Sequence, residues 1–161
     1  MLNDSLIAIF ARRALDELQA QEIVDWAVQE IIAGSDTPEI SVLAGMYPPF
    51  YYSDIDEQFA KVLDEMGIIP PDKKTCLRLY ARQIAQALLD DKIPLPIACH
   101  MLYRIYCASY DAEYFIWEQL NAARRDIIAD GISLYFYEFD LTPENFDAVV
   151  RLEARKFLSS K

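Results

Sequence analysis

The sequence predicts an all-α fold in a single domain that covers residues 1–161. Only 4 glycines interrupt the chain and 53% of its residues are hydrophobic. Leu, Ala, Ile, Glu, Gln and Arg, which favour helix over sheet, are abundant. Apolar residues recur at helical spacing in one segment after another. We therefore expect about seven to eight helices around one core, as a bundle or a short stack of helical hairpins.

Residues that begin and end helices set the boundaries of these segments. Gly34, Gly67 and Gly131 each follow a periodic segment, as a left-handed C-terminal cap does. Thr-Pro-Glu at 37–39 and at 142–144 supplies an N-cap, a proline for the first turn and an acid that the helix dipole favours. The predicted helices are 4–19, 21–33, 38–46, 54–66, 72–90, 95–108, 111–130 and 143–158.

Three segments have features of their own. Residues 46–54, MYPPFYYSD, hold two adjacent prolines among four aromatic residues and should form a rigid, extended loop. Residues 133–141, SLYFYEFDL, alternate enough to form an extended connector laid across the bundle. The helix 95–108 is apolar nearly all round except for His100 and Arg104, which predicts a place in the middle of the bundle.

An internal repeat is compatible with two local similarities. FARRALDEL at 10–18 can be set over YARQIAQAL at 80–88, and SDTPEI at 35–40 resembles YDAEYFI at 110–116. Each copy would be a long helix, a short turn, a second helix, and then Asp and a third helix, as in stacked helical hairpins. Matches of Ala, Arg and Leu in helices also arise by chance, so duplication and coincidence both stay open.

The net charge of −11 is concentrated in the first part of the chain. Residues 1–69 hold 13 acidic and 3 basic residues, a net of −10, and residues 70–161 hold 13 and 12, a net of −1. Nucleic acid and anionic membranes are disfavoured as partners because their phosphates would be repelled. A basic protein partner would be attracted. The alternative is that these acids only keep the surface solvated.

Other features of the sequence favour a cytoplasmic protein. The N-terminus, MLNDSLIAIFARR, lacks the basic leader and apolar core of a signal peptide. The apolar runs are shorter than the roughly 20 residues that a membrane span needs. Three cysteines suit free thiols in a reducing compartment. The oligomeric state stays open.

The sequence shows no catalytic or metal-binding signature. Cys99 and His100 are adjacent, so on a helix they point about 100° apart and cannot serve as nucleophile and base. Ile97 stands where a Glu-x-x-His motif would need its carboxylate. No Cys-x-x-Cys, GxGxxG, Walker A or GxSxG pattern occurs. We expect no catalytic residues, metal or cofactor. The alternative is a small-ligand-binding protein or enzyme whose site is scattered across helices around His100.

The aromatic residues of the 46–54 loop and the acids that follow them form the candidate surface for a partner. Rings would supply buried area and acids would steer a basic protein, unless the rings close the end of the bundle. Reversing Asp54, Asp56 or Glu57 should then slow a salt-sensitive association. The predicted partner-binding residues are Tyr47, Phe50, Tyr51, Tyr52, Asp54, Asp56, Glu57, Asp64, Glu65 and Trp26.

Trp26 belongs to this set because of its place on the helix 21–33. It lies roughly 150° from the centre of the apolar half of that helix, between Glu22 and Glu30. An exposed indole ringed by carboxylates would anchor an interface. In a middle-layer helix it would instead fill a groove against a neighbour. The apolar half consists of Ile23, Val24, Ala27, Val28, Ile31 and Ile32.

Two segments carry a resemblance to known proteins. They are EIVDWAVQEIIAGSDTPEISVLAG at 22–45 and ARQIAQALLDDKIPLPIACHMLYRIY at 81–106, about a third of the chain. Their pattern of helix, turn, helix and Asp-x-Pro-Glu resembles that of small acidic all-helical bacterial proteins, some of which are toxin-immunity proteins. The resemblance implies a non-enzymatic inhibitor that neutralises a basic toxin, and it implies no individual functional residue.

Overall fold

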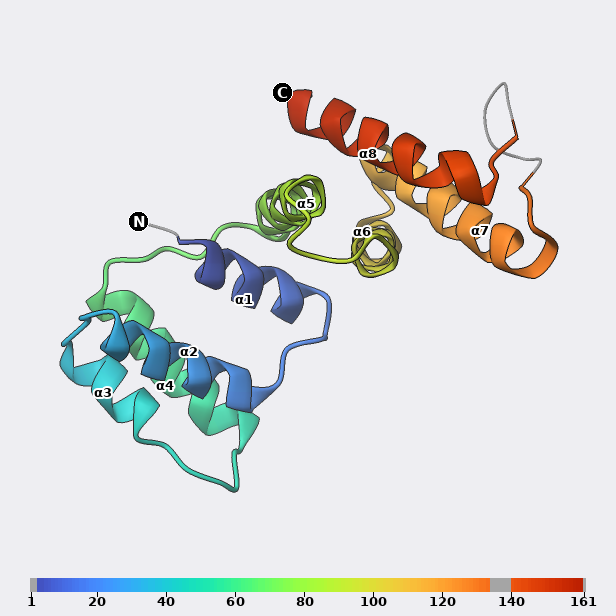
Figure 1. Ribbon diagram of the computed structural model, residues 1–161. Helices are drawn as coiled ribbons and strands as arrows, with labels where there is room; N and C mark the ends of the chain where they lie inside the picture. Colours follow the sequence, from blue (N-terminus) through green and yellow to red (C-terminus); the bar gives the residue numbers. More distant parts are fainter. Residues whose placement is uncertain (1–2, 134–139, 161) are drawn as a thin grey trace. The chain divides into compact units, whose positions relative to one another are not determined.

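The computed structural model describes residues 3–133 and 140–160, and it confirms the all-α prediction. Within these residues it has eight α-helices and one 3-10 helix, which Figure 1 shows. None of the described helices is both long and apolar enough to cross a membrane. The helices are α1 Asp4–Ala14, α2 Ala20–Ile32, α3 Pro38–Ala44, α4 Tyr52–Glu65, α5 Lys73–Leu89, α6 Leu95–Ser109, η1 Ala112–Tyr114, α7 Phe115–Asp130 and α8 Pro143–Ser159.

The chain divides into two compact units. Unit 1 is Met1–Cys76 and unit 2 is Leu77–Lys161, so the division falls near the start of α5. The two units are described separately below. The expectation of a single domain over 1–161 stays a prediction.

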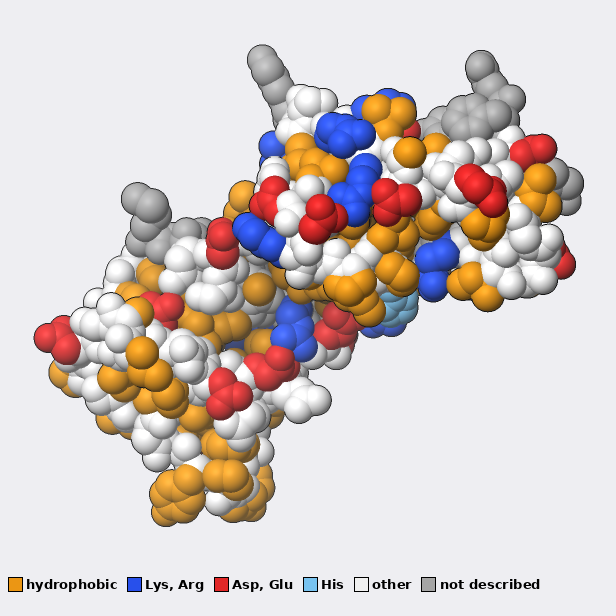
Figure 2. Space-filling view, viewed as in Figure 1, with side chains coloured by type: hydrophobic (Ala, Val, Ile, Leu, Met, Phe, Trp, Pro, Cys, Tyr) orange, Lys and Arg blue, Asp and Glu red, His pale blue; other side chains and the backbone are white. Residues whose placement is uncertain are grey.

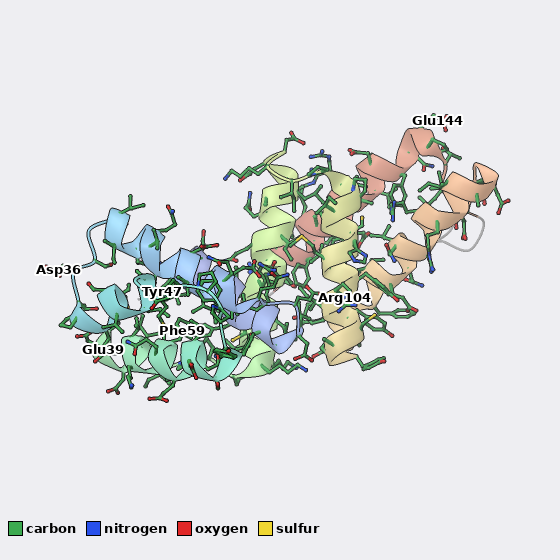
Figure 3. All side chains as sticks on the ribbon, turned by 90° about the horizontal axis from the view of Figure 1, so that it is seen from below. Asp36, Glu39, Tyr47, Phe59, Arg104 and Glu144 are labelled. Carbon is green, nitrogen blue, oxygen red and sulfur yellow. The ribbon has the colours of Figure 1, made fainter. Side chains whose placement is uncertain are left out.

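Unit 1 is built around α2, which packs on α3 and α4, while α3 also packs on α4. Phe59 of α4, labelled in Figure 3, lies at the centre of an aromatic group in this core. Its ring centroid is 6.0 Å from that of Phe10 in α1 and 5.4 Å from that of Trp26 in α2, with the indole edge-on. The core of unit 1 therefore depends on aromatic contacts that join three of its helices.

The buried face of α2 differs from the predicted one. Ile23, Trp26 and Ala27 are buried, whereas Ile31 and Ile32 are exposed. Val28 is also partly exposed. The apolar half of α2 is wider than the strip that α3 and α4 cover. Phe59 of α4 contacts Trp26. The buried strip of α2 is therefore shifted from the centre of its apolar half toward Trp26.

Unit 2 is built around α6 and α7. α6 packs on η1 and α7, and α7 packs on α8. The ring of Phe157 in α8 lies 5.8 Å from that of Tyr114 and 6.2 Å from that of Trp117. Tyr114 and Trp117 are fully buried, so these rings fill the centre of the unit.

The prediction that helix 95–108 lies in the middle of the bundle is wrong for one side of α6. The buried residues of α6 are Ala98, Cys99, Leu102 and Ile105. His100 and Arg104, the latter labelled in Figure 3, are exposed, and so is Ile97. Besides His100 and Arg104, the outer side of α6 carries tyrosines and small residues, which tolerate partial exposure. The apolar composition of this helix therefore did not require that every side of it be buried.

The two units share the turn that joins their first two helices. Asp16 is the second residue after α1 and Asp91 is the second residue after α5, and each has a φ of 56°. The backbone N–H of Glu17 donates to Arg12 O (2.9 Å), and that of Lys92 donates to Ala87 O (2.8 Å). This is the six-residue closure of a Schellman turn in both units. It also explains why α1 ends at Ala14 and not at the predicted residue 19.

The helices after this turn follow the same order in both units. α2, α3 and α4 contact one another, and so do α6, η1 and α7. An aspartate precedes the short third element in both, Asp36 two residues before α3 and Asp111 directly before η1. These correspondences support the internal repeat. Unit 2 has one further helix, α8. Unit 1 has the 45–51 loop between α3 and α4, whereas in unit 2 η1 leads directly into α7.

The predicted connector over 133–141 falls largely outside the described residues, at 134–139. At its two ends, Ser133 and Leu141 form an isolated antiparallel bridge. Ser133 N donates to Leu141 O at 2.8 Å, and Leu141 N donates to Ser133 O at 3.0 Å.

Candidate protein-binding surface

The loop 45–51 presents aromatic side chains to solvent. Tyr47 is 82% exposed, Tyr51 is 63% exposed and Tyr52, the first residue of α4, is 42% exposed. Phe50 is half-buried. Figure 2 shows hydrophobic side chains gathered at the end of unit 1 where Figure 1 places the α3–α4 connection. The three tyrosines are therefore exposed to solvent, and they do not close the end of the bundle as the alternative required.

The loop is joined to the body of unit 1 at its C-terminal end. The hydroxyl of Tyr52 donates to the carbonyl of Leu18 at 3.3 Å. Ile55 and Phe59 follow one and two turns later and are buried. The tyrosines thus stand on a segment that a packed helix holds in place, which limits the entropy lost on binding.

The five predicted acids of α4 point in three directions. The buried residues of α4 define its inner side. At 100° per residue, Glu57 and Asp64 lie opposite that side, and Asp54 lies on its flank, about 60° from Glu57. Asp56 is half-buried and makes an ion pair with Arg13 of α1. Glu65 accepts a hydrogen bond from Glu39 N of α3 at 3.0 Å. The outward acids are therefore Glu57 and Asp64, with Asp54 on their flank.

These three acids lie at different distances from the loop. Asp54 is in the first turn of α4 and three residues from Tyr51. Glu57 is one turn further on, and Asp64 is roughly 15 Å from Asp54 along the axis at 1.5 Å per residue. Asp54 therefore stands beside the rings, whereas Asp64 extends the negative potential along the helix.

The three basic residues of the region 1–69 each form an ion pair with an acidic residue of the same region. Arg12 pairs with Glu22, Arg13 pairs with Asp56, and Lys61 pairs with Glu57. Lys61 Nζ donates to Glu57 Oε1 at 2.8 Å, which lowers the pKa of that carboxyl and raises the pKa of the ammonium group. Each basic residue offsets one of the 13 acids, which leaves the net charge of −10 over 1–69 to attract a cation.

Trp26 is not part of this surface. It is only 5% exposed, and its ring packs edge-on against Phe59. The prediction of an exposed interface anchor at Trp26 is wrong. The alternative, in which the indole fills a groove against a neighbouring helix, is what the structure shows. The side chain lies on the side of α2 that faces α4, and helical periodicity alone could not reveal where α4 lies.

His100 does not face the interior on which the alternative function depends. It is exposed on α6, where its ring lies 6.4 Å from that of Tyr103. Its neighbour Cys99 is buried, and burial raises the pKa of that thiol to about 12 despite the opposing effect of Arg124. A neutral, buried thiol is a poor nucleophile. Among the described residues, no group of three or more His, Cys, Asp or Glu could hold a metal ion.

Sequence reasoning missed several exposed apolar side chains. Ile32 is 72% exposed at the end of α2, and Val42 and Ile69 are also exposed in unit 1. In unit 2, Tyr110 and Phe115 are exposed beside Tyr106, whose ring lies within 6.0 Å of both. Ile32, Val42 and Phe115 lie in helices, where only the placement of neighbouring segments exposes them, whereas Ile69 and Tyr110 lie outside the helices.

No protein-family model, no curated protein and no solved structure matches the chain.

Proposed function

We propose that this protein is a non-enzymatic binding module for a basic protein, most specifically an immunity-type inhibitor that covers the active face of a cationic bacterial toxin. The observation that carries this proposal is the group of exposed tyrosines, Tyr47, Tyr51 and Tyr52, beside the outward acids of α4. Tyrosine is enriched where proteins bind proteins, and carboxylates accelerate encounter with a cation.

The comparison of the two units supports the same proposal. The 45–51 loop has no counterpart in unit 2, where η1 runs directly into α7. The shared arrangement of helices therefore does not need it. Loops that a scaffold does not require, and that expose large rings, are commonly used for binding.

The test is the rate of association with a captured partner. The protein is used to retain partners from its native host, and a retained basic protein is then purified and mixed with it in stopped flow. Asp54→Lys with Asp64→Lys should slow association by about tenfold or more at low salt, because both acids lie outside the buried side of α4. These positions are preferable to Asp56 and Glu57, which pair with Arg13 and Lys61.

The matched control places the same change of charge on unit 2. Asp130 and Asp140 are exposed there, so Asp130→Lys with Asp140→Lys alters the net charge equally. Its association rate should stay within about twofold of the wild type, since a local field and not the total charge steers the partner. Equal slowing by both double variants would contradict a binding surface on α4. Inhibition of the partner's toxicity on co-expression tests the immunity assignment.

A further inference from the structure

We infer that the surface formed by Tyr47, Tyr51 and Asp54 selects arginine over lysine, so that its partner is a segment presenting guanidinium groups. This inference rests on the proposed function and names the chemistry of the group bound there.

The rings of this surface are open to a planar cation. In the part of unit 1 that the structure describes, neither the ring of Tyr47 nor that of Tyr51 stacks on another ring or on a basic side chain. The arginines of this unit are engaged elsewhere, Arg12 with Glu22 and Arg13 with Asp56. Within the described part of unit 1, aromatic faces that its own cations do not cover are therefore exposed next to a carboxylate.

The chemistry of the two cations differs at such a surface. A guanidinium group is planar and weakly hydrated, and it can lie flat on a ring while its N–H groups reach a carboxylate. A lysine ammonium is compact and strongly hydrated, so it gains less from the face of a ring. Asp54, three residues after Tyr51, is placed to accept the N–H groups at the edge of the stacked cation.

The acidic charge alone does not predict this preference. Charge attracts Arg and Lys equally at long range. The selection therefore depends on the phenol rings, and Asp64 at the far end of α4 should contribute attraction without discrimination. This separation of roles makes the inference testable apart from the proposed function.

The experiment uses two fluorescein-labelled 12-residue peptides of Gly and Ser that carry four Arg or four Lys at identical positions. Fluorescence anisotropy gives the dissociation constant of each peptide for the full-length protein at one ionic strength. The Arg peptide should bind about tenfold more tightly than the Lys peptide. Tyr47→Leu with Tyr51→Leu keeps apolar area without phenol rings, and should reduce that ratio to about twofold or less.

Two controls separate the possible outcomes. Tyr110→Leu removes an exposed tyrosine of unit 2, which is 78% exposed, and should leave the ratio unchanged. Asp64→Lys should weaken both peptides equally. Equal affinity for the Arg and Lys peptides, with both weakened by Asp64→Lys, would overturn the arginine preference and leave the proposed function intact. No binding of either peptide would overturn both.

Discussion

Unit 1 and unit 2 use the same arrangement of helices but stabilise it differently. Arg12 of α1 and Arg82 of α5 occupy matching places when the two segments are aligned. Arg12 pairs with Glu22 and donates to Glu17 O at 3.0 Å, so it secures the turn between α1 and α2. Arg82 donates to Ser160 O at 3.1 Å and Leu158 O at 2.6 Å, at the end of α8. The matching side chain therefore serves the element that unit 1 lacks.

The difference extends to charge and to exposed surface. Unit 1 carries most of the excess acid and the 45–51 loop, whereas unit 2 carries ten of the 15 basic residues and the additional helix α8. Helix α8 covers part of α7 and supplies Phe157 to the core. Unit 2 thus has an additional packed helix, whereas unit 1 has an additional exposed loop.

The largest effect should come from Cys99 of unit 2, which should make the protein less stable at alkaline pH. Burial raises the pKa of this thiol from its ordinary value of 9.0 to about 12, with Arg124 opposing and Asp147 adding to the shift. Above pH 9 the unfolded thiol loses its proton while the folded one keeps it. The free energy of unfolding should therefore fall by about 1.4 kcal/mol per pH unit from this group.

Denaturant unfolding at several pH values between 8 and about 11 checks this expectation. Cys99→Ala removes the thiol, so the stability difference between wild type and variant should shrink as the pH rises. On the acid side, burial opposes ionisation of Glu22 in unit 1, but hydrogen bonds from Arg12 and from Gln19 N keep its pKa below the ordinary value. Its contribution is present above pH 4.5 and is lost as the pH falls, and Glu22→Gln should flatten that loss. Parallel pH curves for Cys99→Ala and wild type would refute the alkaline effect.

Replacement of Arg82 should have the next largest effect. Arg82→Met leaves the last carbonyls of α8 without their charged donor, which should cost about 1–2 kcal/mol of unfolding free energy. Arg12→Met should cost less, about 0.5–1 kcal/mol, because its ion pair is partly exposed and screened. Chemical denaturation measures both values, and hydrogen exchange should locate the loosening of the first variant at the end of α8. Similar losses of unfolding free energy in the two variants would show that Arg12 and Arg82 contribute equally to stability.

The smallest effect should come from the two aspartates with positive φ. Asp16→Gly relieves the backbone strain of a left-handed residue and should stabilise the protein by about 0.5–1 kcal/mol. Asp91→Gly relieves the same strain but removes the ion pair with Arg151, whose N–O distance is 2.7 Å. The two contributions should nearly cancel. Thermal unfolding of both variants tests the difference, and an equal gain at the two positions would mean that the Arg151 pair adds nothing.

Local signals in the sequence predicted most of the helices. Gly34, Gly67 and Gly131 have φ values of 103°, 63° and 78°, as expected of left-handed caps. At Thr142 the backbone N–H donates to Asn145 Oδ1 at 2.9 Å, which begins α8 at the predicted place. α1 was predicted too long, because an aspartate in a left-handed conformation is a weaker signal in the sequence than a glycine.

Burial was predicted less well than helix position. Ile32 belongs to the apolar half of α2 and is exposed, whereas Trp26 lies outside that half and is buried. The residues of the 46–54 loop were identified from their prolines and tyrosines, but the sequence left open whether the rings close the bundle or face solvent. Asp56 and Asp54 look alike in the sequence, and only the position of α1 places Arg13 beside one of them.

The sequence by itself determined which segments are helical, where most of them end, and that negative charge collects in residues 1–69, because caps, periodicity and charge are properties of neighbouring residues. The tertiary structure decided which part of each apolar face is covered, which acids are paired, and which rings remain open to a partner. Those outcomes depend on contacts between segments that are distant in the chain, such as Trp26 with Phe59 and Arg13 with Asp56.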